Sequence, residues 1–155
     1  MTVDNLDPIV QEEDLAETEN LNYQEIIETV ISSLEQNDSA MVNHGEQGTL
    51  WKFQYGSVEV FVQMTGTKND DLLTIWSPIL TLPAKNELEL MKQLMAMNWS
   101  GTFETCFALL NDQVVVSHQR TMADLYPGEI SRAITLVATI ADDNDDRLQA
   151  EFGLS

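Results

Sequence analysis

The sequence contains one cysteine and two histidines, residue types that often act together as a nucleophile and its base. Cys106 would need a base within hydrogen-bond reach, and His44 and His118 are the only histidines. If residues 111–112 form a two-residue hairpin turn, Cys106 lies opposite Ser117 and His118 falls on the other face of the sheet. We therefore expect Cys106 to be a small core residue. We predict no catalytic residue, and we expect that the protein is not an enzyme.

The acidic run near the C-terminus is the strongest candidate for a metal site. Asp142, Asn144 and Asp146 have the spacing of the first three ligands of a calcium-binding loop. The downstream positions do not fit, because Arg147 replaces the required glycine and Gly153 stands where the bidentate glutamate should be. The apolar spacing around this run favours a helix with a solvated acidic face, so we predict neither a metal nor a cofactor.

Two other polar segments are interpreted as turns. Asp70 and Asp71 follow Lys68 and Asn69, in a polar stretch where turn-forming acids are common. Residues 45–48 contain two glycines, but no lysine follows them as it does in a phosphate-binding loop. The sequence also lacks the HExxH and GxSxG motifs of known hydrolases.

Three segments have the spacing of helices. The first begins near Asn22, where Glu25 completes a capping box and Leu21 and Ile26 form a hydrophobic staple, and it ends near Asn37. The second follows Asn86, with Glu89 predicted as its capping partner, and the third follows Pro127. Residues 1–20 are acidic without a sustained apolar period, which indicates a disordered leader ahead of a single domain at 21–155.

The segments between these helices alternate between apolar and polar residues, as strands do. Strands are predicted around residues 51–55, 58–62, 72–78, 103–110 and 113–118, and Pro78 is expected to limit the third. The fold class is therefore α+β, with a single antiparallel sheet of about five strands and three helices in the order α-β-β-β-α-β-β-α.

The charge is far from balanced, with 26 Asp and Glu against 7 Lys and Arg and a net charge of −19. Such a field repels phosphates, so we expect no direct binding to nucleic acid and none to a membrane. The acidity either keeps the protein soluble or steers it to a basic partner. One cysteine, no signal peptide and no apolar run of membrane-spanning length indicate the cytoplasm.

The second helix carries more apolar residues than one buried stripe requires. They are Leu88, Leu90, Met91, Leu94, Met95 and Met97. Methionine-rich faces adapt to varied partners because the side chain is flexible and polarizable. This helix either lies inside the core or forms a dimer or client interface, for which the candidate residues are Leu88, Met91, Leu94 and Met95.

The element order and several short segments resemble the YbjN family of bacterial proteins, whose fold is similar to that of type III secretion chaperones. The matching segments are Trp51, Phe53 and Tyr55 before a turn, residues 73–78, the apolar helix ending at Asn98, residues 106–109 and 114–116, and Ala141 with Asp142. The resemblance implies a small acidic subunit, often dimeric, that holds an extended segment of a client protein. YbjN relatives are also described as sensory-transduction regulators, and no active residue is carried over.

These observations favour a chaperone-like protein-binding domain that forms a homodimer through its second helix. An alternative is an acidic regulatory protein, a sensory-transduction regulator or a nucleic-acid mimic, that binds a basic protein through its −19 charge. A third possibility, an enzyme, is disfavoured because no nucleophile and base are paired.

Overall fold

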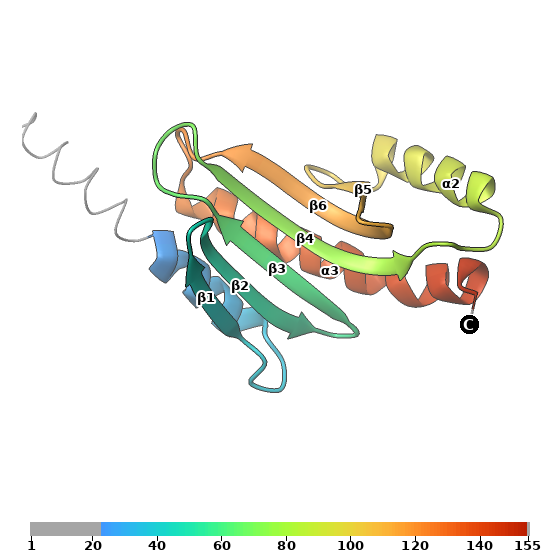
Figure 1. Ribbon diagram of the computed structural model, residues 1–155, viewed down its shortest axis with the longest axis horizontal. Helices are drawn as coiled ribbons and strands as arrows, with labels where there is room; N and C mark the ends of the chain where they lie inside the picture. The colour runs from blue at the N-terminus through green and yellow to red at the C-terminus, as the bar shows by residue number, and fades with distance from the viewer. Residues whose placement is uncertain (1–22, 155) are drawn as a thin grey trace, which may run out of the picture.

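The computed structural model describes residues 23–154 (Figure 1). A helix at residues 23–34 leads into four strands, followed by a helix, two strands and a long helix. Their bounds are β1 (Met41–Gly45), β2 (Gly48–Tyr55), β3 (Val58–Met64), β4 (Leu72–Thr81), α2 (Glu87–Ser100), β5 (Cys106–Leu110), β6 (Gln113–Thr121) and α3 (Pro127–Phe152). The predicted acidic leader, and the predicted cap at residues 21–22, lie outside the described residues.

All strand pairs of the sheet are antiparallel, in the order β1-β2-β3-β4-β6-β5. The α+β class, the single antiparallel sheet and the three helices are confirmed, but four strands and not three lie between the first two helices within residues 23–154. The described residues form six strands where about five were expected, and the additional one is β1. The strand, Met-Val-Asn-His-Gly, shows no alternation of buried and exposed residues, because all five are exposed. β1 is a strand because β2 offers it hydrogen-bond partners.

β4 is longer than predicted and continues through Pro78 to Thr81. Pairing with β3 stops at Trp76, whereas pairing with β6 continues past a register shift between Pro78 and Leu80. The missing N–H of Pro78 would face β3, so its loss does not interrupt the β6 ladder. Ser77 donates a hydrogen bond from Oγ to the Glu59 carbonyl oxygen at 2.6 Å, which satisfies β3 at this point.

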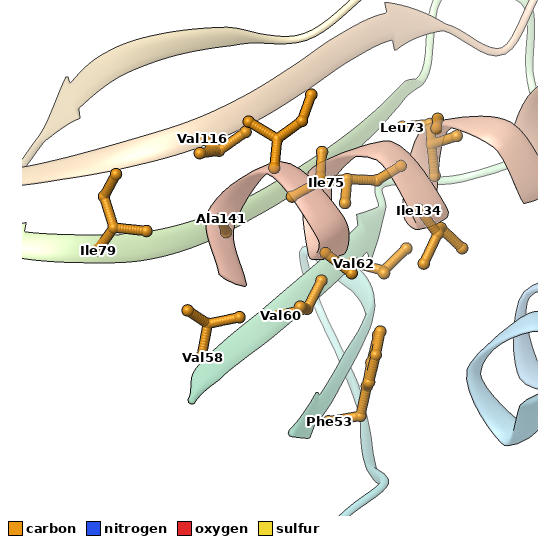
Figure 2. Packing of buried hydrophobic residues seen from close by; sticks show 14 of the residues in the cluster. Phe53, Val58, Val60, Val62, Leu73, Ile75, Ile79, Val116, Ile134 and Ala141 are labelled. Atoms are coloured by element: carbon orange, nitrogen blue, oxygen red, sulfur yellow. The ribbon is translucent and has the colours of Figure 1, made fainter. Parts of the chain in front are cut away.

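The core lies between the sheet and α3, which runs behind the strands in Figure 1. Buried residues of α3 recur at the helical spacing that the sequence predicts, among them Ile130, Ile134, Val137 and Ala141. Figure 2 shows Ile134 and Ala141 among apolar side chains from the strands. The fully buried strand residues here include Val60, Val62, Leu73 and Ile75. α3 spans the whole acidic run at residues 142–146, so the prediction of a helix at this run is confirmed.

The start of α2 differs from the predicted capping box. Asn86 is the N-cap residue, but it has left-handed backbone angles and its side chain makes no capping hydrogen bond. Instead, the Glu87 carboxylate accepts a hydrogen bond from the N–H of Ala84 at 2.9 Å. Without a capping hydrogen bond from the Asn86 side chain, the predicted capping box with Glu89 does not form.

Candidate protein-binding surface

Cys106 and His118, the residues considered for catalysis, contact different groups. Cys106 pairs with Ser117 across the β5–β6 hairpin, as predicted, and its Sγ lies 3.6 Å from Ser117 Oγ. His118 Nδ1 lies 3.0 Å from the carbonyl oxygen of Glu104. The predicted turn is confirmed by positive φ angles of 50° at Asn111 and 62° at Asp112. The prediction that Cys106 belongs to the core is wrong: the cysteine is exposed, because the neighbouring Phe107 is the residue of this pair that faces the core.

The acidic residues considered for metal binding have structural partners. Within residues 23–154, no group of three or more His, Cys, Asp or Glu side chains could hold a metal ion. Asp142 and Asp145 accept hydrogen bonds from Ser57 and so tie the β2–β3 turn to α3. Asp71 accepts hydrogen bonds from Thr65 Oγ1 and the Lys68 N–H, which confirms its turn role.

Helix α2 has two apolar faces. One face is buried against the protein and carries Leu90 and Leu94. The other face carries Leu88, Met95 and Trp99, which are 72%, 70% and 91% exposed. Their spacings of seven and four residues place them on one side of the helix. This exposed stripe is not used by the fold.

A groove of about 370 Å³ separates α2 from β5. Its lining residues are Met91, Leu94, Met95, Asn98, Phe107, Ala108 and Leu109. None of the described residues that line the groove is charged, although the chain carries a net charge of −19. We call the exposed α2 stripe together with this groove the α2–β5 surface. Contiguous exposed apolar surface of this kind marks sites of protein interaction.

Asn98 links the two elements that form the groove. Its Oδ1 accepts a hydrogen bond from the Phe107 N–H at 2.7 Å, and its Nδ2 donates one to the Phe107 carbonyl oxygen at 3.2 Å. The side-chain amide thus takes the place of a neighbouring strand at this residue of β5. As a result, α2 is held in position beside the sheet edge.

An ion pair borders the α2–β5 surface. Arg132 Nε donates to Glu104 Oε2 at 2.8 Å and Arg132 Nη2 donates to Glu104 Oε1 at 3.1 Å. These bonds lower the pKa of the Glu104 carboxyl and raise the pKa of Arg132. The Arg132 guanidinium also lies 5.9 Å from the ring centroid of Phe103, which is 76% exposed.

The four interface residues named from the sequence all lie in or beside this surface. Leu88 and Met95 are exposed, Met91 is partly buried, and Leu94 is buried at the base of the groove. Sequence reasoning missed Trp99 and Leu109. Trp99 could have been found because it continues the spacing of Leu88 and Met95. Leu109 lies in β5 and joins the groove only through tertiary packing.

The chain belongs to the YbjN family, whose model, described as "Putative bacterial sensory transduction regulator", matches residues 23–150. Its fold resembles that of ExsC, a type III secretion chaperone. A chain in the crystal structure of the ExsC–ExsE complex superposes with a TM-score of 0.58 at 12% sequence identity, over 82% of this chain and 93% of that chain. No curated protein sequence matches the chain. Within residues 23–154, no helix is long and apolar enough to cross a membrane.

Proposed function

We propose that this protein is a non-enzymatic, chaperone-like domain that binds another protein and holds an extended segment of that client. The observation that carries the proposal is the α2–β5 surface, which is apolar and exposed on a strongly acidic chain. Leaving large apolar side chains in water is unfavourable, and a partner that covers them gains about 25 cal/mol per Å² of buried apolar area. The family and the fold, a regulator family and a chaperone-like fold, support a binding role.

We further propose that two copies of the chain associate through α2. Leu88, Met95 and Trp99 form a stripe along the whole helix, and a two-fold axis would place the stripes of two copies against each other. The stripe residues are uncharged, so two such helices can approach without burying an unpaired charge from the stripe itself. The interface residues proposed here include the four named from the sequence.

Light scattering after size exclusion tests the dimer. The wild-type protein is expected at about twice the chain mass of 17.4 kDa. Met95→Glu introduces a charge into the stripe and is expected to give the monomer mass. Met41→Glu is the matched control, because Met41 is similarly exposed, 63% against 70%, but lies on the opposite edge of the sheet. A monomeric wild type, or a Met95→Glu variant that stays dimeric, would remove α2 from the interface.

The client-binding role is tested with a model client in two states. The probe is a ribonuclease that has been reduced and alkylated so that it stays unfolded, with the native ribonuclease as its control. Fluorescence anisotropy is expected to show binding of the unfolded form and none of the native form, because only the unfolded chain offers extended apolar segments. Equal affinity for both forms, or no binding of the unfolded form, contradicts the proposed function.

The acidic-regulator alternative is favoured by the charge alone. In the described residues, Lys52, Arg120, Arg132 and Arg147 are each paired with a glutamate, which leaves many more carboxylates than cations at the surface. A protein of this second kind would bind a folded basic partner. Such a protein would not prefer the unfolded ribonuclease over the native one, which separates it from the chaperone-like function.

A further inference from the structure

The two edge strands of the sheet differ in whether their backbone groups are already satisfied. At β5, the two-residue turn makes Leu110–Gln113 and Ala108–Val115 hydrogen-bonded pairs with β6. The residues between them, Phe107 and Leu109, therefore point their backbone N–H and C=O groups outward, away from β6. Both groups of Phe107 are bonded to Asn98. The next outward residue, Thr105, donates its N–H to the Thr102 carbonyl oxygen at 2.9 Å. Most of the β5 edge is therefore closed to a further strand.

The opposite edge, β1, is open. Gly45 and Gly48 flank the β1–β2 turn as a pair. Hydrogen-bonded pairs alternate along an antiparallel hairpin, so the next ones are Asn43–Leu50 and Met41–Lys52. The backbone N–H and C=O groups of Val42 and His44 therefore point outward, away from β2. Within residues 23–154, no hydrogen bond joins the outward backbone groups of Val42 or His44 to another residue. β1 also carries no Lys, Arg, Asp or Glu, the residues with which proteins commonly protect an exposed edge.

An apolar groove runs beside this open edge, between β1 and the helix at residues 23–34. It has a volume of about 240 Å³ and is lined by Glu28, Ile31, Ser32, Ala40, Met41, Val42 and Trp51. Val42 and Trp51 pair across the two strands and so point to the same face, toward this helix. Figure 1 shows β1 at the margin of the sheet with the helix next to it. A strand added to β1 would direct every second side chain into the groove.

The charges around β1 identify the chemistry of the occupant. Glu28 lines the groove, Glu46 is in the β1–β2 turn, and Glu35 and Asp38 precede β1. The nearest cation, Lys52, is engaged by Glu59. A second copy of the chain would bring these carboxylates against their own equivalents. An extended segment with Lys or Arg between apolar residues would meet opposite charges instead.

We propose that the β1 edge binds an extended segment of a partner protein, with alternating apolar and basic residues, as an additional strand of the sheet. This inference rests on the proposed function and assigns the client segment to a site distinct from the α2–β5 surface. The outward N–H and C=O groups of Val42 and His44 supply the backbone hydrogen bonds. The groove beside Ile31 takes the apolar side chains, and the surrounding carboxylates select the basic ones.

Hydrogen exchange on the intact protein tests the position of the segment. The probe is a synthetic peptide of roughly six residues that alternates Val and Lys. Binding is expected to slow exchange of the Val42 and His44 amides and to leave the Leu109 amide unchanged. A peptide that alternates Val and Glu is the charge control and is expected not to bind. Slowed exchange at Leu109 with none at Val42 would overturn the assignment to β1.

Two proline variants test the edge by affinity. Val42→Pro removes an outward N–H without breaking the β1–β2 ladder, and Leu109→Pro makes the same change at the β5 edge. Val42→Pro is expected to weaken binding of the Val–Lys peptide roughly tenfold, and Leu109→Pro to leave it unchanged. Equal effects of the two variants contradict the inference, and circular dichroism confirms that each variant is folded.

The α2 variant separates this inference from the proposed function. Met95→Glu is expected to remain able to bind the Val–Lys peptide. If Met95→Glu loses the peptide while Val42→Pro retains it, the α2–β5 surface holds the segment, so the β1 inference fails and the proposed function stands. If neither the peptide nor the unfolded ribonuclease binds to the wild type, both fail.

Discussion

The turn between β2 and β3 is held against α3 by Ser57. Its N–H and Oγ donate to Asp142 Oδ1 at 3.0 and 3.1 Å, and Oγ also lies 2.7 Å from Asp145 Oδ2. A hydroxyl has one hydrogen to donate, so the two carboxylates share it. The carboxylate of Asp145 is buried, and Ser57 is therefore the residue that connects a buried acid to the surface turn.

Gly56 permits this close approach of the turn to α3. It has φ of +56°, and a Cβ at this position would lie 2.1 Å from Asp142 Oδ1. We expect Gly56→Ala to lower the free energy of unfolding by about 1–3 kcal/mol, because the side chain adds both backbone strain and a steric clash. Urea denaturation measures the change. Gly45→Ala is the control, with no atom within 4 Å of the added Cβ, and a loss of equal size there would contradict the explanation.

The Glu104–Arg132 pair predicts a dependence of stability on pH. Hydrogen bonds from Arg132 lower the pKa of Glu104 below its ordinary value of 4.5. A carboxyl whose pKa is lower in the folded state stabilises the protein above its unfolded-state pKa, and this contribution is lost as pH falls through the folded-state pKa. Wild type should therefore be slightly more stable than Glu104→Gln at neutral pH. The difference should vanish well below pH 4.5, and urea denaturation at both pH values checks it. A difference that persists in acid would indicate a packing effect.

At the scale of elements, Asn98 connects α2 to the β5 edge. Replacing it with alanine would leave the N–H and C=O of Phe107 without their partner. We expect Asn98→Ala to lower the free energy of unfolding by about 1–3 kcal/mol and to speed exchange of the Phe107 amide. Denaturation and hydrogen exchange measure the two effects.

Asn144→Ala is the matched control for this change. Asn144 is also in a helix, and its side chain bonds only to the Ile140 carbonyl oxygen of its own helix. Both variants gain the same helix propensity of alanine, so their difference reports the contact with β5. If the two variants are equally stable, Asn98 does not hold α2 in place.

At the scale of the whole molecule, the net charge of −19 predicts opposite effects of salt on the two proposed interactions. Two copies of the chain repel each other, so added salt should strengthen the dimer. A basic client segment is attracted, so added salt should weaken its binding. Light scattering and peptide anisotropy over a salt series measure both trends. Two trends of the same sign would show that charge does not distinguish the partners.

The elements with strong local signals could be predicted from the sequence. The spacing of apolar residues in α3 indicates a helix through the acidic run at residues 142–146, because these residues recur every three or four positions on both sides of the run. Asn111 and Asp112 tolerate positive φ, which determines the turn and hence the register of β5 against β6. The α+β class and the YbjN resemblance follow from the same local patterns.

Local sequence patterns account for the helices and for most of the strands, whereas the packing of distant segments accounts for which surfaces remain exposed. Both faces of α2 are apolar, so periodicity does not tell that Leu90 is buried and Met95 is exposed. Cys106 is exposed and Phe107 is buried because they lie on opposite faces of β5, and only one of these faces meets the core. β1 is a strand through its pairing with β2, and the β5 edge is closed at Phe107 by Asn98 from another element. The physical reason is that periodicity is a property of neighbouring residues, whereas burial and edge pairing depend on segments that are distant in the sequence.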